Sequence, residues 1–214
     1  MRSAMNSRAV GDYLTRPVAV FMLILAAVLS GCALPQRGPS PLLYDFGARS
    51  PGATPAASTA AALPALATTV QATPAFDGNA MLYRLAYADG QQLRAYTQAR
   101  WAMPPAELVQ QRLREGLSGQ FTVLRPGEDA PRVLQLELEE FSQVFDAADK
   151  SSGLLRLRAT VRQRLPSGER MMAQRTVVVK RPAPSADAAG GVRALSTATD
   201  AAVDELAQWL RQWR

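Results

Sequence analysis

The chain has 214 residues, of which 48% are hydrophobic and 20% charged, a composition typical of one globular domain rather than of a disordered protein. Its 24 Lys and Arg against 18 Asp and Glu leave a formal charge of +6, which indicates a mildly basic surface and not a nucleic-acid-binding stripe. Histidine is absent and Cys32 is the single cysteine. This excludes Ser-His-Asp and Cys-His catalysis, zinc sites built from His or several Cys, and an intramolecular disulfide.

A secretory leader is predicted for residues 1–31. Three arginines precede an apolar run at 18–29, which is shorter than the roughly 20 residues a membrane-spanning helix needs. The run has the length of the apolar region of a secretory signal. It ends in Leu29-Ser30-Gly31-Cys32, and small residues before a cysteine at this place resemble the lipobox of bacterial lipoproteins.

The lipobox resemblance implies that residues 1–31 are removed and that Cys32 carries an S-diacylglycerol and an N-acyl chain. Each buried methylene contributes about 0.8 kcal/mol and a single chain binds only marginally, so three chains would hold the protein on a membrane. Residue 33 is Ala rather than the Asp that commonly retains enteric lipoproteins in the inner membrane, which favours the periplasmic face of the outer membrane. The alternative is an uncleaved anchor with an unmodified Cys32.

Residues 32–64 are predicted to be an acylated N-terminus followed by a flexible tether. The segment 33–41 is short and Pro-rich, and 47–64 is a low-complexity stretch of Ala, Pro, Ser, Thr and Gly. Between them, Leu42–Phe46 has the composition of a short strand. We expect the folded domain to occupy residues 65–214.

The first half of this domain is predicted to contain a strand at 65–73 and a hairpin at 81–98, whose turn is Asp89-Gly90. Pro104-Pro105 then begins a helix, because proline is tolerated in a first helical turn, and Gly119 ends it. A short strand follows at 121–125.

The second half contains three strands, at 133–145, 154–165 and 171–180, in which hydrophobic and polar residues alternate. The alternation breaks at Glu139-Glu140, which indicates a bulge. A long amphipathic helix is predicted at 187–213. The fold class is therefore α/β (α+β mixed), with a single mixed β-sheet, largely an antiparallel meander, and two helices packed on it.

Candidate chemistry is sparse. Glu137 and Glu139 could form an acid/base pair, but their position opposite arginines on a solvent-facing strand favours an ion-pair ladder. A row of arginines could bind anionic headgroups or an acidic partner, or be a solvated strand face: Arg156, Arg158, Arg162 and Arg164. No aromatic residues interleave with it, which argues against single-stranded nucleic acid. We predict no enzyme activity, no metal, and no cofactor apart from the lipid on Cys32.

The motifs of residues 65–213 resemble those of the ABC-type transport auxiliary lipoprotein family. These motifs are MLYRLAY at 81–87, LRAY at 93–96, RWA at 100–102, PPA at 104–106, LELEEFSQVF at 136–145, and Asp187 followed by GVRAL at 191–195. The resemblance implies a mixed α/β domain in a non-enzymatic outer-membrane lipoprotein. It also implies partners, namely an ABC permease with its ATPase and a periplasmic mammalian-cell-entry-type protein that moves lipids across the envelope.

A contact surface for such a partner is predicted where aromatic residues and arginine concentrate, since these types are enriched at the centres of interfaces. Its residues are Tyr83, Arg84, Tyr96, Arg100 and Trp101. The alternative is that most of them belong to the core. Two other functions stay open: a periplasmic lipid-binding carrier with a cavity lined by residues such as Phe121, Phe141 and Leu157, and an envelope assembly or secretion lipoprotein.

Overall fold

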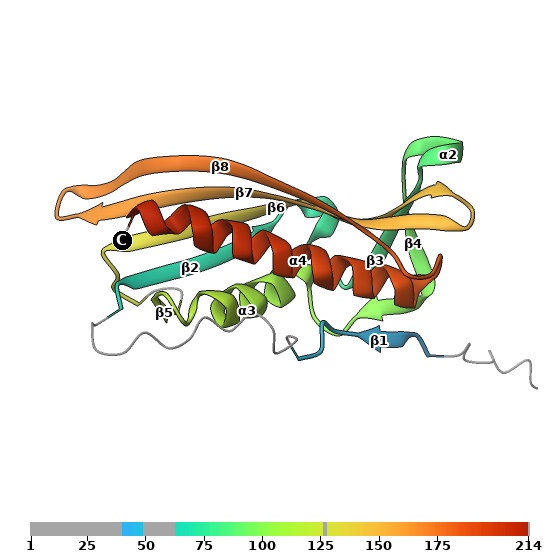
Figure 1. Ribbon diagram of the computed structural model, residues 1–214, viewed down its shortest axis with the longest axis horizontal. Helices are drawn as coiled ribbons and strands as arrows, with labels where there is room; N and C mark the ends of the chain where they lie inside the picture. Colours follow the sequence, from blue (N-terminus) through green and yellow to red (C-terminus); the bar gives the residue numbers. More distant parts are fainter. Residues whose placement is uncertain (1–39, 49–62, 126–127, 214) are drawn as a thin grey trace, which may run out of the picture. The chain divides into compact units, whose positions relative to one another are not determined.

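The computed structural model describes residues 40–48, 63–125 and 128–213. The predicted leader 1–31 and Cys32 lie outside the described residues, so Leu29, Ser30, Gly31 and Cys32 have no structural account here. The described residues from Pro41 onward form one compact unit by their contacts. Its architecture is an eight-stranded mixed sheet with two helices packed on one face (Figure 1).

The sheet is organised around β6, its central strand. One edge of β6 pairs first with β2 and then with β3, and the other edge pairs with β7. Beyond these neighbours lie β5 next to β2, β4 next to β3 with β1 on the far side of β4, and β8 next to β7. The strands are β1 Leu42–Tyr44, β2 Ala65–Ala72, β3 Ala80–Leu85, β4 Gly90–Trp101, β5 Thr122–Leu124, β6 Arg132–Ala147, β7 Lys150–Leu165 and β8 Gly168–Pro182.

The expectation of a largely antiparallel meander is wrong for the sheet as a whole. Of the seven strand pairings within the described residues, four are parallel and join β1 to β4, β2 to β5, β2 to β6 and β3 to β6. Antiparallel pairing is confined to β3–β4 and to the run β6–β7–β8. The alternation of hydrophobic and polar residues shows which residues face the core, but it does not show which strand lies alongside. Parallel strands are joined by long connections, so their pairing cannot be predicted from local spacing.

Local patterns are confirmed more closely. The register of β6 against β7 shifts between Leu138 and Glu140, where the alternation predicted a bulge. The predicted hairpin at 81–98 is present as β3 and β4, although a helical turn, α2 (Ala86–Asp89), joins them instead of a tight turn. Two 3-10 turns, η1 (Pro74–Phe76) and η2 (Arg211–Trp213), complete the order of elements.

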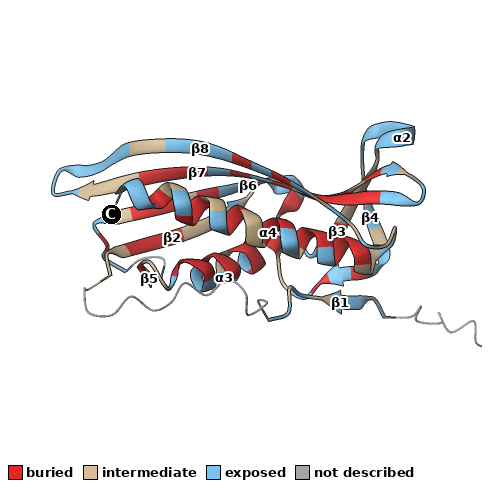
Figure 2. Ribbon diagram, viewed as in Figure 1, coloured by how far each residue is buried: buried red, intermediate tan, exposed pale blue. Residues whose placement is uncertain are grey.

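Both long helices bury one side against the sheet and against each other (Figure 2). The helix α3 (Pro105–Leu117) begins at the predicted proline and buries Leu108, Val109, Leu113 and Leu117. The helix α4 (Ala188–Leu210) lies over β6, β7 and β8 and begins after Asp187. No helix within the described ranges is both long enough and apolar enough to cross a bilayer.

The close approach of α4 to β7 depends on Gly153. A Cβ atom at this position would lie 2.7 Å from the backbone nitrogen of Leu195 and 2.8 Å from the carbonyl carbon of Ala194. Both atoms belong to the helix backbone, which cannot move aside as a flexible side chain could. Gly153 is therefore required for this packing.

Candidate functional site

The five residues predicted to form a partner surface lie on β3 and β4, but the structure divides them. Trp101 is only 1% exposed and its ring lies 5.9 Å from that of Phe46 and 5.4 Å from that of Phe141. It is a core residue and does not contribute to an accessible surface, which corrects its placement from sequence. A tryptophan in a pattern rich in arginine fits either a surface or a core, and only the packing of distant residues decides between them.

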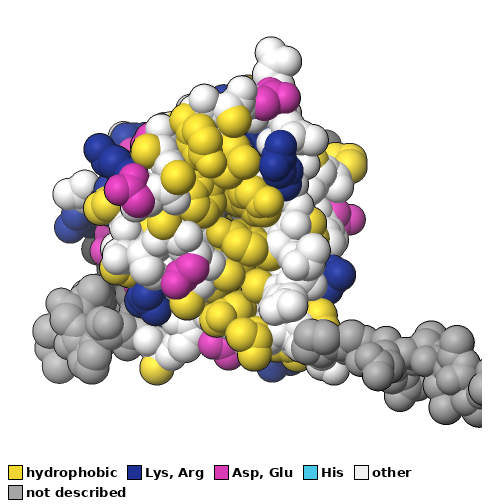
Figure 3. Space-filling model, turned by 90° about the vertical axis from the view of Figure 1, so that its right-hand side faces the viewer, with side chains coloured by type: hydrophobic (Ala, Val, Ile, Leu, Met, Phe, Trp, Pro, Cys, Tyr) yellow, Lys and Arg dark blue, Asp and Glu magenta, His cyan; other side chains and the backbone are white. Residues whose placement is uncertain are grey.

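Tyr83 and Tyr96 form a half-buried aromatic pair between β3 and β4. Their ring centroids are 4.7 Å apart, and Tyr83 also makes an edge contact with Phe145 at 5.9 Å. The described residues hold four tyrosines, and all of them lie in β1, β3, α2 or β4. Figure 3 shows hydrophobic side chains forming a band across this end of the molecule.

A buried polar network ties this pair to the start of α4. The hydroxyl of Tyr96 donates to Oε1 of Gln143 at 2.9 Å, and Nε2 of Gln143 donates to Oγ of Ser151 at 2.8 Å and to the carbonyl of Asp187 at 3.1 Å. Burial, with the negative charges that Tyr83 and Asp187 can carry, raises the pKa of Tyr96 to about 12. The phenol therefore remains a donor at any physiological pH.

Gly191 makes room for this network, because a Cβ atom there would lie 2.1 Å from Oε1 of Gln143. Sequence reasoning missed Gln143. The available signal was a glutamine at a core-facing position of a strand, where an amide needs hydrogen-bond partners.

Asp187 anchors the same region by capping α4. Its carboxylate accepts hydrogen bonds from the backbone nitrogen of Gly190 at 2.6 Å and from Oγ of Ser185 at 2.7 Å. These two bonds hold the pKa of Asp187 below its usual value. The cap satisfies a backbone donor that the first turn of a helix would otherwise leave unpaired.

Arg84 and Arg100 differ in their surroundings. Arg84 donates to Glu140 at 3.2 Å, so the carboxylate at the bulge of β6 holds it, and it also approaches the carbonyl of Gln91. Arg100 is exposed and lies in register with Leu43 of β1, at the far end of β4 from α2. We call the group around α2, consisting of Tyr83, Arg84, Tyr87, Arg94 and Tyr96, the aromatic end.

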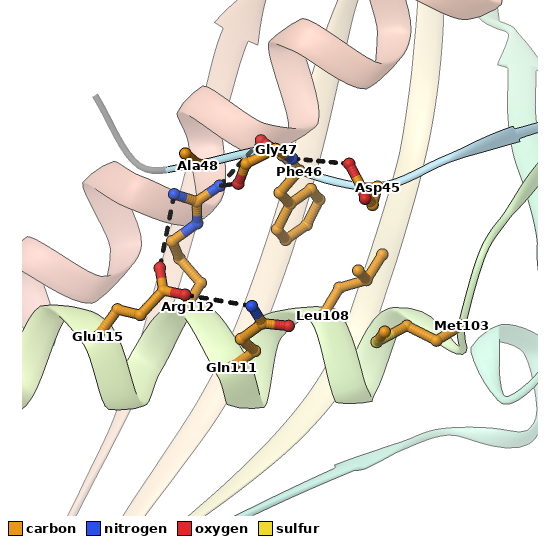
Figure 4. Close-up of a pocket in the computed structure, with 9 residues that line it drawn as sticks. All are labelled: Asp45, Phe46, Gly47, Ala48, Met103, Leu108, Gln111, Arg112 and Glu115. Atoms are coloured by element: carbon orange, nitrogen blue, oxygen red, sulfur yellow. Dashed lines mark hydrogen bonds and ion pairs between the residues drawn. The ribbon is translucent and has the colours of Figure 1, made fainter.

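A second feature is the segment 45–48, which follows β1 and which we call the strap. Figure 4 shows it running alongside α3. Residues of the strap and of α3 line a hollow of about 280 Å³. Arg112 of α3 is 2% exposed and donates to the carbonyls of Phe46 at 3.0 Å and of Gly47 at 3.2 Å. Its guanidinium carbon lies 5.5 Å from the centre of the Phe46 ring.

The charge of Arg112 is balanced by two carboxylates. Asp200 of α4 lies 3.3 Å from its Nε and Glu115 of α3 lies 3.8 Å from Nη1. The arginine thus joins the strap to both helices. Sequence reasoning missed it, and the signal was an arginine within the apolar stripe of the helix at 105–117.

The family follows from comparison with known proteins. Residues 44–207 match the family described as ABC-type transport auxiliary lipoprotein component. The chain belongs to this family. The match begins in β1, so the strap lies within the family domain, and the family name associates this auxiliary lipoprotein with an ABC transporter.

Solved structures agree with this fold. A Xanthomonas campestris protein is 22% identical, covers 70% of this chain and 84% of its own, and superposes with a TM-score of 0.61. A second, described as an uncharacterized protein, is 12% identical and covers 80% of this chain and 99% of its own, with a TM-score of 0.59. No curated protein matches this auxiliary lipoprotein.

The sheet face away from the helices of the auxiliary lipoprotein carries the predicted arginine row. Arg158 forms ion pairs with Glu137 and Glu139, Arg162 donates to Gln135 at 2.8 Å, and Arg164 pairs with Glu169 at 3.4 Å. The glutamates of the candidate acid/base pair thus take part in a solvated ion-pair ladder. Within the described ranges, no group of three or more acidic, His or Cys side chains is placed to hold a metal ion.

Proposed function

We propose that this auxiliary lipoprotein is the anchored docking subunit of an ABC-type lipid transport system in the bacterial envelope. Acylated Cys32 holds it at the periplasmic face of the outer membrane, and the aromatic end receives a periplasmic mammalian-cell-entry-type protein. ATP hydrolysis belongs to the cytoplasmic ATPase, and this chain performs no chemistry of its own.

The observation that carries the docking role is the composition of the aromatic end. Three tyrosines and two arginines gather on β3, α2 and β4, and Tyr87 is 52% exposed. Tyrosine and arginine supply large contact areas and directional donors, which is why they dominate the energetically important residues of interfaces. The Gln143 network keeps this surface rigid before a partner arrives, which lowers the entropic cost of docking.

The packing of the domain favours docking over lipid carriage. Phe121, Phe141 and Leu157, the residues expected to line a lipid cavity, are all buried in the main core cluster between sheet and helices. A carrier needs a cavity that can take an acyl chain, and these side chains occupy the space such a cavity would require.

The docking test replaces Arg84 and Tyr87 by Glu in the full chain. We expect at least a tenfold loss of the permease, ATPase and mammalian-cell-entry-type protein that co-purify with it, while circular dichroism and membrane retention stay unchanged. Tyr87→Ser alone is the second variant, because it leaves the Arg84–Glu140 pair intact. Arg170→Glu with Arg175→Glu, on the distant strand β8, is the matched control. Unchanged co-purification by a folded double variant would refute the docking surface.

The anchor is tested separately by mass spectrometry of the mature N-terminus. We expect the chain to begin at Cys32 with a diacylglycerol on its sulfur and an acyl group on its amino nitrogen. Separation of inner and outer membranes should place it in the outer membrane fraction. A chain that retains its leader and carries no lipid would overturn the anchor.

A further inference from the structure

Two adjacent leucines are exposed at the beginning of the domain. Leu42 is 63% exposed and Leu43 is 69% exposed, and both belong to the edge strand β1. The other exposed large hydrophobic side chains of the described residues come singly along the chain: Tyr87, Leu165, Met171 and Val178. Isolated exposed hydrophobic residues are ordinary, whereas a contiguous pair suggests a contact surface.

The geometry of β1 allows both leucines to reach one surface. Consecutive side chains of a strand point to opposite faces of the sheet. Because β1 is the outermost strand beside β4, a surface that approaches this edge can touch the side chains on both faces. Arg100, which is exposed and in register with Leu43, adds a cation next to the apolar pair.

The length of chain before β1 limits what this edge can meet. Leu42 follows Cys32 by ten residues, and a fully extended chain spans at most about 3.5 Å per residue, so Leu42 lies within about 35 Å of the acylated cysteine. A linker this short gives the Leu42–Leu43 edge an effective concentration on the order of millimolar at the membrane. Even a contact that is weak by itself is then well populated.

We infer that the Leu42–Leu43 edge is a membrane contact that enters the headgroup region of the bilayer to which Cys32 is anchored. The leucine side chains bury apolar surface there, and Arg100 meets lipid phosphates. This inference rests on the proposed acyl anchor. The acyl chains already retain the protein, so the edge sets its orientation and leaves the aromatic end, at the other end of β4, free for a partner.

The test uses the chain from Ala33 to Arg214 with a histidine tag in place of the acylated cysteine. The tag binds it to vesicles of phosphatidylethanolamine and phosphatidylglycerol that contain a nickel-chelating lipid and brominated acyl chains. Leu43→Trp reports contact with the bilayer through quenching by bromine. Val178→Trp is the matched control, because Val178 is exposed to a similar degree but lies on the strand β8 at the other edge of the sheet.

We expect the emission that Leu43→Trp adds to that of the unsubstituted chain to fall at least twofold on brominated vesicles, and the emission added by Val178→Trp to stay unchanged. Adding Leu42→Ser and Arg100→Ser to Leu43→Trp should abolish most of the quenching. Equal quenching of both introduced tryptophans, or none for Leu43→Trp, overturns the inference and leaves a protein partner as the occupant of this edge. Since the tag replaces the acyl chains, this result is independent of whether Cys32 is lipidated.

Discussion

Two of the outer strands of the sheet, β8 and β1, differ strongly. The edge strand β8 is 15 residues long and carries exposed charged side chains, including Arg175, which pairs with Glu205, and Lys180, which lies 3.1 Å from Asp146. Charged residues and a terminal proline are the usual protection of an open edge against unwanted strand pairing. The edge strand β1 has three residues, two of them exposed leucines, and is followed by the strap.

The two edges differ in how they are connected to the rest of the domain. The charged side chains of β8 act at the surface, where each ion pair contributes little and independently. The strap of the β1 edge is joined to the core, since Phe46 lies on Trp101 and Arg112 binds two strap carbonyls from beneath. We therefore expect substitutions under the β1 edge to be costly and substitutions on β8 to be nearly neutral.

The largest effect is expected for Trp101→Ala. Removing a fully buried indole leaves a cavity beneath the strap and should lower the free energy of unfolding by about 3–5 kcal/mol. Chemical denaturation measures this loss. Trp209→Ala, at a half-buried position of α4, serves as the control and should cost clearly less. An equal or smaller loss for Trp101→Ala would contradict the assignment of Trp101 to the core.

Arg112→Ala should lower the free energy of unfolding by about 2–3 kcal/mol, because two carbonyls and two carboxylates lose their shared partner. We expect faster hydrogen exchange in the strap, residues 45–48, in particular. Arg114→Ala, which removes an exposed arginine from the same helix, is the control and should leave both measurements unchanged. If exchange at the strap is equally slow in both variants, Arg112 does not hold the strap.

Tyr96→Phe should cost about 1 kcal/mol at neutral pH, since Oε1 of Gln143 loses its donor. The unfolded chain releases a tyrosine proton near pH 10, whereas folded Tyr96 keeps its proton up to about pH 12. The native protein should therefore lose stability between these two values, and Tyr96→Phe should lack this part of the loss. Denaturation at about pH 9 and about pH 11.5 tests the sign, with Tyr87→Phe as the exposed control.

The smallest effect is expected on the β8 edge. Arg175→Ala and Lys180→Ala each remove a partly exposed ion pair and should change the free energy of unfolding by less than about 0.5 kcal/mol. The change should shrink further at high salt. A loss above about 1 kcal/mol for either variant would contradict the expectation that the ion pairs of β8 contribute little to stability.

Sequence patterns predicted most elements because they depend on local spacing. The alternation in β6 and β7, the bulge near Glu140, the proline that begins α3 and the start of α4 at Asp187 all follow from residues a few positions apart. Local spacing did not predict the direction of strand pairing. The parallel pair β3–β6, for example, places Tyr83 opposite Gln143, and these residues are far apart in the sequence. Arg112 and Gln143 were missed because each binds a backbone carbonyl more than 40 residues away in the chain.

By itself, the amino-acid sequence of this protein determined the family resemblance and the residues that face the core. Its composition excludes common catalytic sites, and its N-terminus predicts the export signal with Cys32. These depend on residue type and short-range spacing, which the chain carries in any conformation. Tertiary structure decided that Trp101 is buried, that the strap is held by Arg112, and that the tyrosines gather at one end. These features depend on contacts between segments far apart in the chain. Side chains fill a close-packed interior, so only the tertiary structure determines which of them are buried and which segments they contact.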